Sequence, residues 1–107
     1  MIVRKAKGLM EINGTFYFDP DDRIYEDHFP GNPVVPGSVI VNAFLKAGKE
    51  SGFWEGRYII EGFRFKGFVS TGEHAYRIHF QTDQMNCRLF QTASGSSKTL
   101  VTGTLRK

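Results

Sequence analysis

The 107-residue chain is 40% hydrophobic and 23% charged, a composition typical of a single folded globular domain and not of a disordered chain. Its formal net charge is +3, but it lacks the dense Lys/Arg runs of many nucleic-acid-binding proteins, so we expect no nucleic-acid partner. The basic residues 1–8 are not followed by an apolar stretch, and no apolar run approaches the roughly 18 residues of a membrane helix. We therefore expect a cytoplasmic protein with neither a signal peptide nor a membrane span.

The cysteine count and the charge distribution give further expectations about the compartment, the cofactors and the partners of the protein. Cys87 is the only cysteine and its surroundings lack metal-ligand spacing, so we expect no disulfide, no metal and no cofactor, which suits a reducing compartment. Five of the eleven acidic residues lie in the segment 19–27, and the rest of the chain is basic. Such a basic surface either attracts an acidic partner or is simply solvated.

The first predicted element in chain order is a strand over Met10–Phe18, which mixes β-branched and aromatic residues, with Gly14 as a candidate bulge. The residues 19–22 stop this strand, because Pro and Asp favour turns. The loop that follows runs to Pro36 and contains three prolines, each of which fixes its own backbone and restricts the residue before it. We therefore expect this loop to be rigid.

The only substantial helix is predicted over Ser38–Ser51, with Gly52 as its stop. At the helical period of about 100° per residue, one wide arc of this segment is apolar and the opposite face is polar. The apolar arc comprises Ile40, Val41, Ala43, Phe44, Leu45, Ala47 and Gly48, and the polar face comprises Ser38, Asn42, Lys46 and Lys49. A helix this apolar should be buried over much of its surface.

Strands are predicted for the remaining half of the chain, at residues 57–69, 74–82, 86–92 and 98–105. In the first of them, Gly62 and Gly67 occupy positions that suit a bend or a bulge. His74 and His79 are interpreted as ordinary residues of the second strand. One buried helix followed by several antiparallel strands predicts an α+β fold, with a sheet wrapped on a helix.

The most informative segment is His28–Gly37, with the sequence HFPGNPVVPG, which leads directly into the predicted helix. It resembles the active-site signature of the 3-hydroxyacyl-acyl-carrier-protein dehydratases, His-Phe-Pro-Gly-x-Pro-x-x-Pro-Gly, at every fixed position. Phe63–Lys66 and Thr71–Glu73 also resemble segments of this family, and the resemblance runs in order from about Thr15 to the end. It implies a hot-dog fold, an antiparallel sheet wrapped around one central helix, with two subunits that share active sites at their interface.

The chemistry of such a dehydratase can be assigned to residues of this segment. Dehydration of a 3-hydroxyacyl thioester requires a base for the C2 proton, an acid for the leaving hydroxyl and donors for the thioester oxygen. His28 titrates near neutrality and can exchange protons at cellular pH. Gly37 lies where the loop becomes the helix, so its free backbone N–H can face a developing oxyanion.

One position departs from the family pattern. In the family a Glu or Asp lies fourteen residues after the histidine and reaches the histidine of the opposite subunit, whereas this position is Asn42 here. An amide can hydrogen-bond and orient a hydroxyl, but it cannot donate a proton at ordinary pH. Loss of a positioned acid typically costs about 10²–10⁴ in rate. Asn42 is therefore either a catalytic position with altered chemistry or simply a solvated residue of the polar helix face.

Three functions are compatible with these residues. The first is a (3R)-hydroxyacyl-acyl-carrier-protein dehydratase-like enzyme of fatty-acid or polyketide-type biosynthesis, in which His28 does most of the work and Asn42 or a water replaces the acid. The second is a catalytically impaired or heterodimer-dependent acyl-binding subunit, whose missing carboxylate comes from a related chain. The third is a hot-dog thioesterase, in which His28, Asn42 and the Gly37 amide position a thioester for attack by water.

The same resemblance indicates how substrate and partners are held. We expect an acyl thioester on acyl carrier protein or coenzyme A, with its chain in an apolar tunnel lined by Phe29, Phe63 and Phe65. Arg64 and Lys66 should help to dock an acidic carrier. Because a small sheet on one helix leaves an edge strand exposed, a homodimer or a heterodimer with a related chain is expected.

Overall fold

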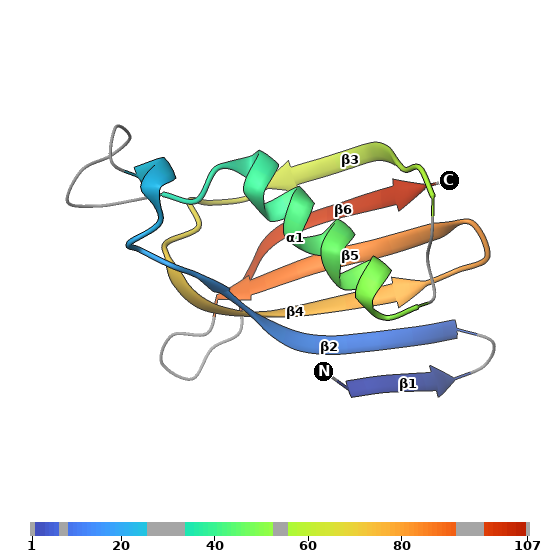
Figure 1. Ribbon diagram of the computed structural model, residues 1–107. Coiled ribbons are helices and arrows are strands. Elements are labelled where there is room, and N and C mark those ends of the chain that lie inside the picture. Colours follow the sequence, from blue (N-terminus) through green and yellow to red (C-terminus); the bar gives the residue numbers. More distant parts are fainter. Residues whose placement is uncertain (1, 7–8, 26–33, 53–55, 92–97, 107) are drawn as a thin grey trace.

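The computed structural model describes residues 2–6, 9–25, 34–52, 56–91 and 98–106, which form a six-stranded antiparallel sheet and one α-helix. The elements are β1 (Ile2–Ala6), β2 (Leu9–Phe18), the short 3-10 helix η1 (Arg23–Tyr25), α1 (Gly37–Glu50), β3 (Ile59–Phe65), β4 (Gly72–Phe80), β5 (Gln84–Gln91) and β6 (Lys98–Arg106). The strand order across the sheet is β1-β2-β4-β5-β6-β3, and α1 lies across one face of it (Figure 1). Among the described residues, no helix is long and apolar enough to cross a membrane.

The helix confirms the sequence prediction to within one residue at each end. Pro36, with φ −62° and ψ 147°, is the N-cap, and the N–H groups of Val39 and Ile40 donate to its carbonyl. At the other end the Ser51 N–H donates to the Ala47 carbonyl, and Gly52 adopts a φ of +79°, which glycine tolerates and which ends the helix. The segment is therefore helical because its apolar arc faces the sheet, and it ends where Gly52 takes a conformation that the helix cannot continue.

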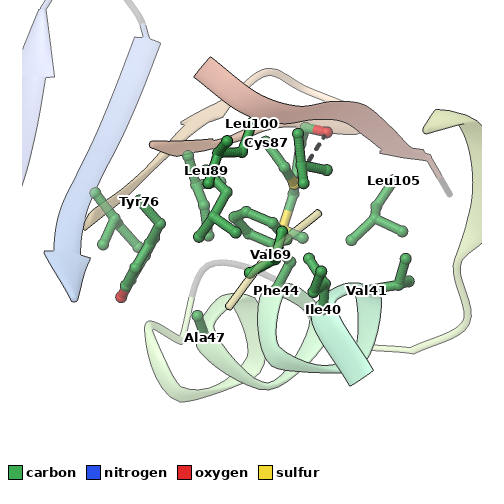
Figure 2. Close-up of a cluster of buried hydrophobic side chains, with 14 of the residues drawn as sticks. Ile40, Val41, Phe44, Ala47, Val69, Tyr76, Cys87, Leu89, Leu100 and Leu105 are labelled. Carbon is green, nitrogen blue, oxygen red and sulfur yellow. Dashed lines mark hydrogen bonds between the residues drawn. The ribbon is translucent and has the colours of Figure 1, made fainter. Parts of the chain in front are cut away.

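The hydrophobic core fills the space between α1 and the inner face of the sheet (Figure 2). The buried residues of α1 all belong to the predicted apolar arc, whose other two members, Ala43 and Leu45, are half-buried. They are Ile40, Val41, Phe44, Ala47 and Gly48. Along β4 and β5 buried residues alternate with exposed or half-buried ones. The most buried side chains of the strands are Ile12, Ile78, Met85, Leu89, Val101 and Leu105. The same alternation places polar side chains on the outer face, so the sheet has one apolar side and one polar side.

The strand β3 lies at one edge of the sheet and ends earlier than predicted, at Phe65 and not at residue 69. Its pairing with β6 shifts register between Glu61 and Arg64, around Gly62, which has a φ of +62°. Gly67 lies in a bend. The predicted bulge and bend at these two glycines are thus confirmed, and together they turn the chain from β3 toward the start of β4.

Two expectations from the sequence are wrong. No strand was predicted before Met10, yet β1 pairs with β2 in continuous register from Ile2↔Asn13 to Ala6↔Leu9. Arg4 and Lys5 interrupt the apolar pattern that would predict a strand here, but charged residues are tolerated at a sheet edge. A bulge was considered at Gly14, but β2 pairs with β4 without a register shift.

Gly14 instead makes room for an aromatic ring from the neighbouring strand. It pairs directly with Tyr76 of β4, and a Cβ at position 14 would lie 2.7 Å from the hydroxyl oxygen of that tyrosine. Tyr76 also stacks on Phe16, with ring centroids 3.9 Å apart. The glycine is therefore explained by close packing of a side chain and not by a change in strand geometry.

Candidate active site

The amino-terminal half of the signature segment, including His28 and Phe29, lies outside the described residues. Its carboxyl-terminal end is described and is fixed by backbone contacts. Val34 forms a bridge with Ser70, and the Val35 N–H donates to the Val69 carbonyl at 2.8 Å. The next residue, Pro36, accepts hydrogen bonds from Val39 at 3.1 Å and from Ile40 at 3.2 Å. The segment therefore enters α1 as an extended strand held on the segment between β3 and β4.

Gly37 is the first residue of α1, at the position where the loop becomes the helix. Since N–H groups of the first turn have no acceptor within their own helix, the Gly37 N–H can donate to a ligand. A Cβ at this position would lie 2.9 Å from Cζ of Phe65, so the ring of that residue lies against the glycine backbone. Two of the residues that the sequence singled out, Gly37 and Phe65, are thus brought together from separate elements.

The space around this contact is an open apolar groove of about 420 Å³. It is lined by Val34, Val35, Pro36, Gly37, Ile40, Phe65, Gly67, Phe68 and Val69. Phe68 is 84% exposed, so a large apolar surface lies beside the first turn of α1. A groove of this composition can hold a hydrocarbon group next to a backbone N–H donor.

Asn42 lies on the exposed face of α1, between two further grooves that it helps to line. The groove on the β3 side, of about 500 Å³, is mainly apolar and includes Val41, Leu45 and Ile60. The groove on the β2 side, of about 470 Å³, includes charged residues, among them Lys46. In the described part of the chain the Asn42 amide has no hydrogen-bond partner, so both its donor and its acceptor can serve a ligand.

Tyr76, which the sequence pattern does not single out, lines the groove on the β2 side. Burial raises the pKa of its phenol, and the negative charge of Glu50 adds to this effect. The hydroxyl therefore keeps its proton at neutral pH and can donate to a ligand in the groove. The strand alternation placed Tyr76 on the inner face, but the groove beside it depends on contacts that the pattern does not contain.

The remaining predicted site residues are divided between the two faces of β3. The Phe63 ring is half-buried against Gly103 and lies near Phe44, with ring centroids 6.3 Å apart. Arg64 and Lys66 line a polar groove of about 700 Å³ at the outer face. The substrate-lining role of Phe63 stays a prediction, since the ring packs against the core.

The outer-face groove is also lined by Arg88 of β5, which the sequence did not single out. Among the described residues, Arg64, Lys66 and Arg88 have no ion pair with a carboxylate. By contrast, Arg77 lies 3.4 Å from Glu11 on the same face. The three unpaired side chains give this part of the surface a local positive charge.

Comparisons with known proteins agree with the resemblance found in the sequence. The family described as ApeI dehydratase matches residues 4–104. A curated relative, the 3-hydroxyacyl-[acyl-carrier-protein] dehydratase FabZ of Herpetosiphon aurantiacus, is 30% identical over 93 residues, which are 79% of this chain and 63% of that protein. The chain thus matches less than two thirds of the length of that relative.

Two solved structures are similar to the chain over almost its whole length. An uncharacterized protein from Erwinia carotovora subsp. atroseptica has a TM-score of 0.83 at 16% identity, with 97% of this chain and 87% of that one covered. A chain of the dehydratase heterocomplex ApeI:P from Xenorhabdus doucetiae has a TM-score of 0.69 at 19% identity, with 94% of this chain and 88% of that one covered. These similarities establish the hot-dog fold that the sequence predicted.

Proposed function

The chain belongs to the ApeI-like dehydratase family, and we propose that it acts as a (3R)-hydroxyacyl-acyl-carrier-protein dehydratase in fatty-acid or polyketide-type biosynthesis. The observation that carries this proposal is the complete signature His28–Gly37, whose described end leads into α1 with the Gly37 N–H at the first turn. A base, a rigid loop and a backbone donor are the groups that the elimination of water from a thioester needs.

In the proposed reaction His28 removes a proton from C2 of the substrate while the Gly37 N–H stabilises the negative charge on the thioester oxygen. The C3–O bond then breaks, a double bond forms between C2 and C3, and the hydroxyl leaves as water. Asn42 can orient this hydroxyl but cannot supply a proton to it. The proton therefore comes from the protonated His28 or from a water molecule, so one histidine carries most of the proton transfer.

The acyl chain of the substrate is proposed to lie in the apolar grooves beside α1. Val41, Leu45 and Ile60 line the groove on the β3 side of Asn42, and Phe65 lies beside Gly37. Both surfaces are apolar and adjacent to the positions proposed for catalysis, as expected for a site that binds a hydrocarbon chain. Phe29 and Phe63 are the other two predicted lining residues.

A second subunit is proposed to cover the free edge of β3. This strand ends the sheet on one side, and it carries exposed apolar side chains, with Ile59 48% and Ile60 58% exposed. An open strand edge with apolar neighbours favours association of two chains. The second subunit is either another copy or a related chain that supplies the carboxylate missing at Asn42. The similarity to a subunit of a dehydratase heterocomplex supports the latter arrangement as a second candidate.

The acidic carrier protein is proposed to dock at the outer-face groove with Arg64, Lys66 and Arg88. These cations have no carboxylate partner among the described residues, so an acidic partner can pair with them without breaking an existing ion pair. Carriers and their enzymes of this kind meet in the cytoplasm, which is the location that we propose.

The proposal is tested by incubating the purified chain alone with 3-hydroxyacyl and enoyl thioesters on carrier protein and on coenzyme A. Dehydration, hydration and release of free thiol are scored separately. We expect dehydration that His28→Ala abolishes and that Gln81→Ala, a change of an exposed side chain just after β4, leaves intact. Thiol release without dehydration would identify a thioesterase instead. Activity that appears only on adding a related chain would identify a heterodimer subunit.

A further inference from the structure

His74 is the only polar or charged side chain that is buried among the described residues. Its side chain is 4% exposed and points inward from β4, close to the start of that strand. From the sequence alone, His74 is an ordinary strand residue. A buried imidazole needs hydrogen-bond partners, and the partner that it has lies in the segment that holds the signature loop.

The hydrogen bonds of two successive carbonyl groups explain the position of this ring. The Val69 carbonyl accepts the N–H of Val35 at 2.8 Å. The next carbonyl, that of Ser70, lies 2.8 Å from Nε2 of His74. Because a carbonyl oxygen only accepts, Nε2 must carry the proton and donate it. The histidine therefore satisfies the carbonyl of the residue that bridges to Val34.

We infer that His74 is a positioning residue for the proposed oxyanion donor at Gly37. A continuous series of contacts links the ring to this donor. His74 donates to the Ser70 carbonyl, and the segment 69–70 pairs with Val34 and Val35. Pro36 follows directly and is the N-cap of α1. A displacement of the segment 69–70 moves Val35 and, two residues further, the N–H of Gly37. The inference rests on the proposed function, because it assumes that this N–H contacts the thioester oxygen.

The other ring nitrogen, Nδ1, makes no hydrogen bond among the described residues, so a replacement side chain needs to reproduce only the donor at Nε2. Nδ1 is fully buried and has no hydrogen-bond partner among the described residues. The contact with Ser70 therefore requires only one donor, at the position of Nε2. A glutamine side chain can place an amide N–H close to the position of Nε2. His74→Gln should therefore keep the contact with Ser70, whereas His74→Leu removes it at similar bulk.

The experiment combines amide hydrogen exchange with steady-state kinetics of the whole chain. In His74→Leu we expect the Val35 N–H to exchange at least about tenfold faster while the amides of β5 are unaffected, which indicates a local opening. We expect kcat to fall by about ten- to a hundredfold with KM within about threefold, since misplaced donors act on the transition state. His74→Gln should restore both quantities. Gln81→Leu, which changes an exposed side chain just beyond the other end of β4, should change neither.

Each outcome decides a separate step. Unchanged exchange at Val35 in His74→Leu would overturn the positioning inference, whatever the activity. Faster exchange with an unchanged kcat would show that the segment does not set the Gly37 donor and would also overturn it. If His74→Leu fails to fold, His74→Gln provides the test. Faster exchange at Val35 together with a lower kcat in His74→Gln would contradict the inference. If the wild-type chain has no dehydratase activity, the proposed function fails, and the exchange measurement still tests the link from His74 to Val35.

Discussion

Asn42 lies on the exposed face of α1 between two grooves. Replacing it with a carboxylic acid distinguishes a dehydratase that has lost only its acid from a subunit that works only in a heterodimer. If the site has lost only its acid, Asn42→Glu should increase dehydration by up to about a hundredfold, the low end of the contribution of a general acid. The comparison is made as kcat/KM of the purified chain alone. His28→Ala should abolish activity in both backgrounds, because an acid without a base does not complete the elimination. An Asn42→Glu variant that stays inactive until a related chain is added would indicate a subunit that works only in a heterodimer.

Gly14 gives a prediction about stability that is independent of function. A methyl group at this position would lie 2.7 Å from the Tyr76 hydroxyl, so the ring or the strand must move. We expect Gly14→Ala to destabilise the fold by about 1–3 kcal/mol, as measured by urea unfolding. Gly67→Ala is the matched control, since its Cβ would meet only Leu100, at an ordinary 3.8 Å. Equal effects of the two substitutions would contradict the described packing of Tyr76.

The sequence predicts a helix or strand correctly where a pattern within one segment decides the structure. The helix α1 was predicted to within a residue because its apolar arc and its glycine stop both lie in the segment itself. Contacts between distant segments were not predictable in this way. Gly14 was assigned a bulge because its register with β4 is unknown from sequence, and β1 was missed because its partner strand stabilises it.

The same distinction applies to the candidate site. The position of Gly37 at the start of α1 followed from the signature motif, and the structure agrees. Tyr76 is part of the site because it lines a groove, and His74 because it hydrogen-bonds to Ser70. Neither contact can be inferred from a sequence pattern. The place of His28 beside these groups remains a prediction of the motif.

The edge strand β3 is where an effect on assembly is expected. Ile60 is 58% exposed on this strand, and a charge there would have to be desolvated against a second subunit. We expect Ile60→Lys to weaken dimerisation at least about tenfold, a loss of roughly 1.4 kcal/mol, as measured by analytical ultracentrifugation. Ile24→Lys changes another exposed isoleucine, on η1, and should have no effect. A wild-type chain that stays monomeric at micromolar concentration would remove the basis of this expectation.

The whole molecule separates its surfaces by chemistry. The side that carries α1 presents two apolar grooves, one charged groove and Asn42, whereas the outer face of the sheet presents Arg64, Lys66 and Arg88. The exposed carboxylates of Asp19 and Asp22 belong to the turn after β2. Because Arg64, Lys66 and Arg88 lie around one groove without a carboxylate partner among the described residues, the small net charge of +3 understates the local field that a partner meets there.

This local field gives a prediction about the carrier protein that concerns the molecule as a whole. If the carrier docks on the outer face, raising the salt concentration from 50 to 300 mM should weaken its affinity by about tenfold, because exposed charges are screened over roughly 6 to 14 Å in this range. Isothermal titration calorimetry with acyl carrier protein measures the Kd at each salt concentration.

The matched variants assign this salt dependence to particular side chains. Arg88→Glu and Lys66→Glu should each weaken binding at low salt and flatten its dependence on salt, since each removes one cation and adds a repulsive charge. Arg77→Gln serves as the control, because this arginine already contacts Glu11 and Asn13 and offers less free charge to a partner. If affinity were independent of salt, or if Arg77→Gln weakened binding as much as Arg88→Glu, the carrier would dock elsewhere. The outer-face groove would then have no part in substrate delivery.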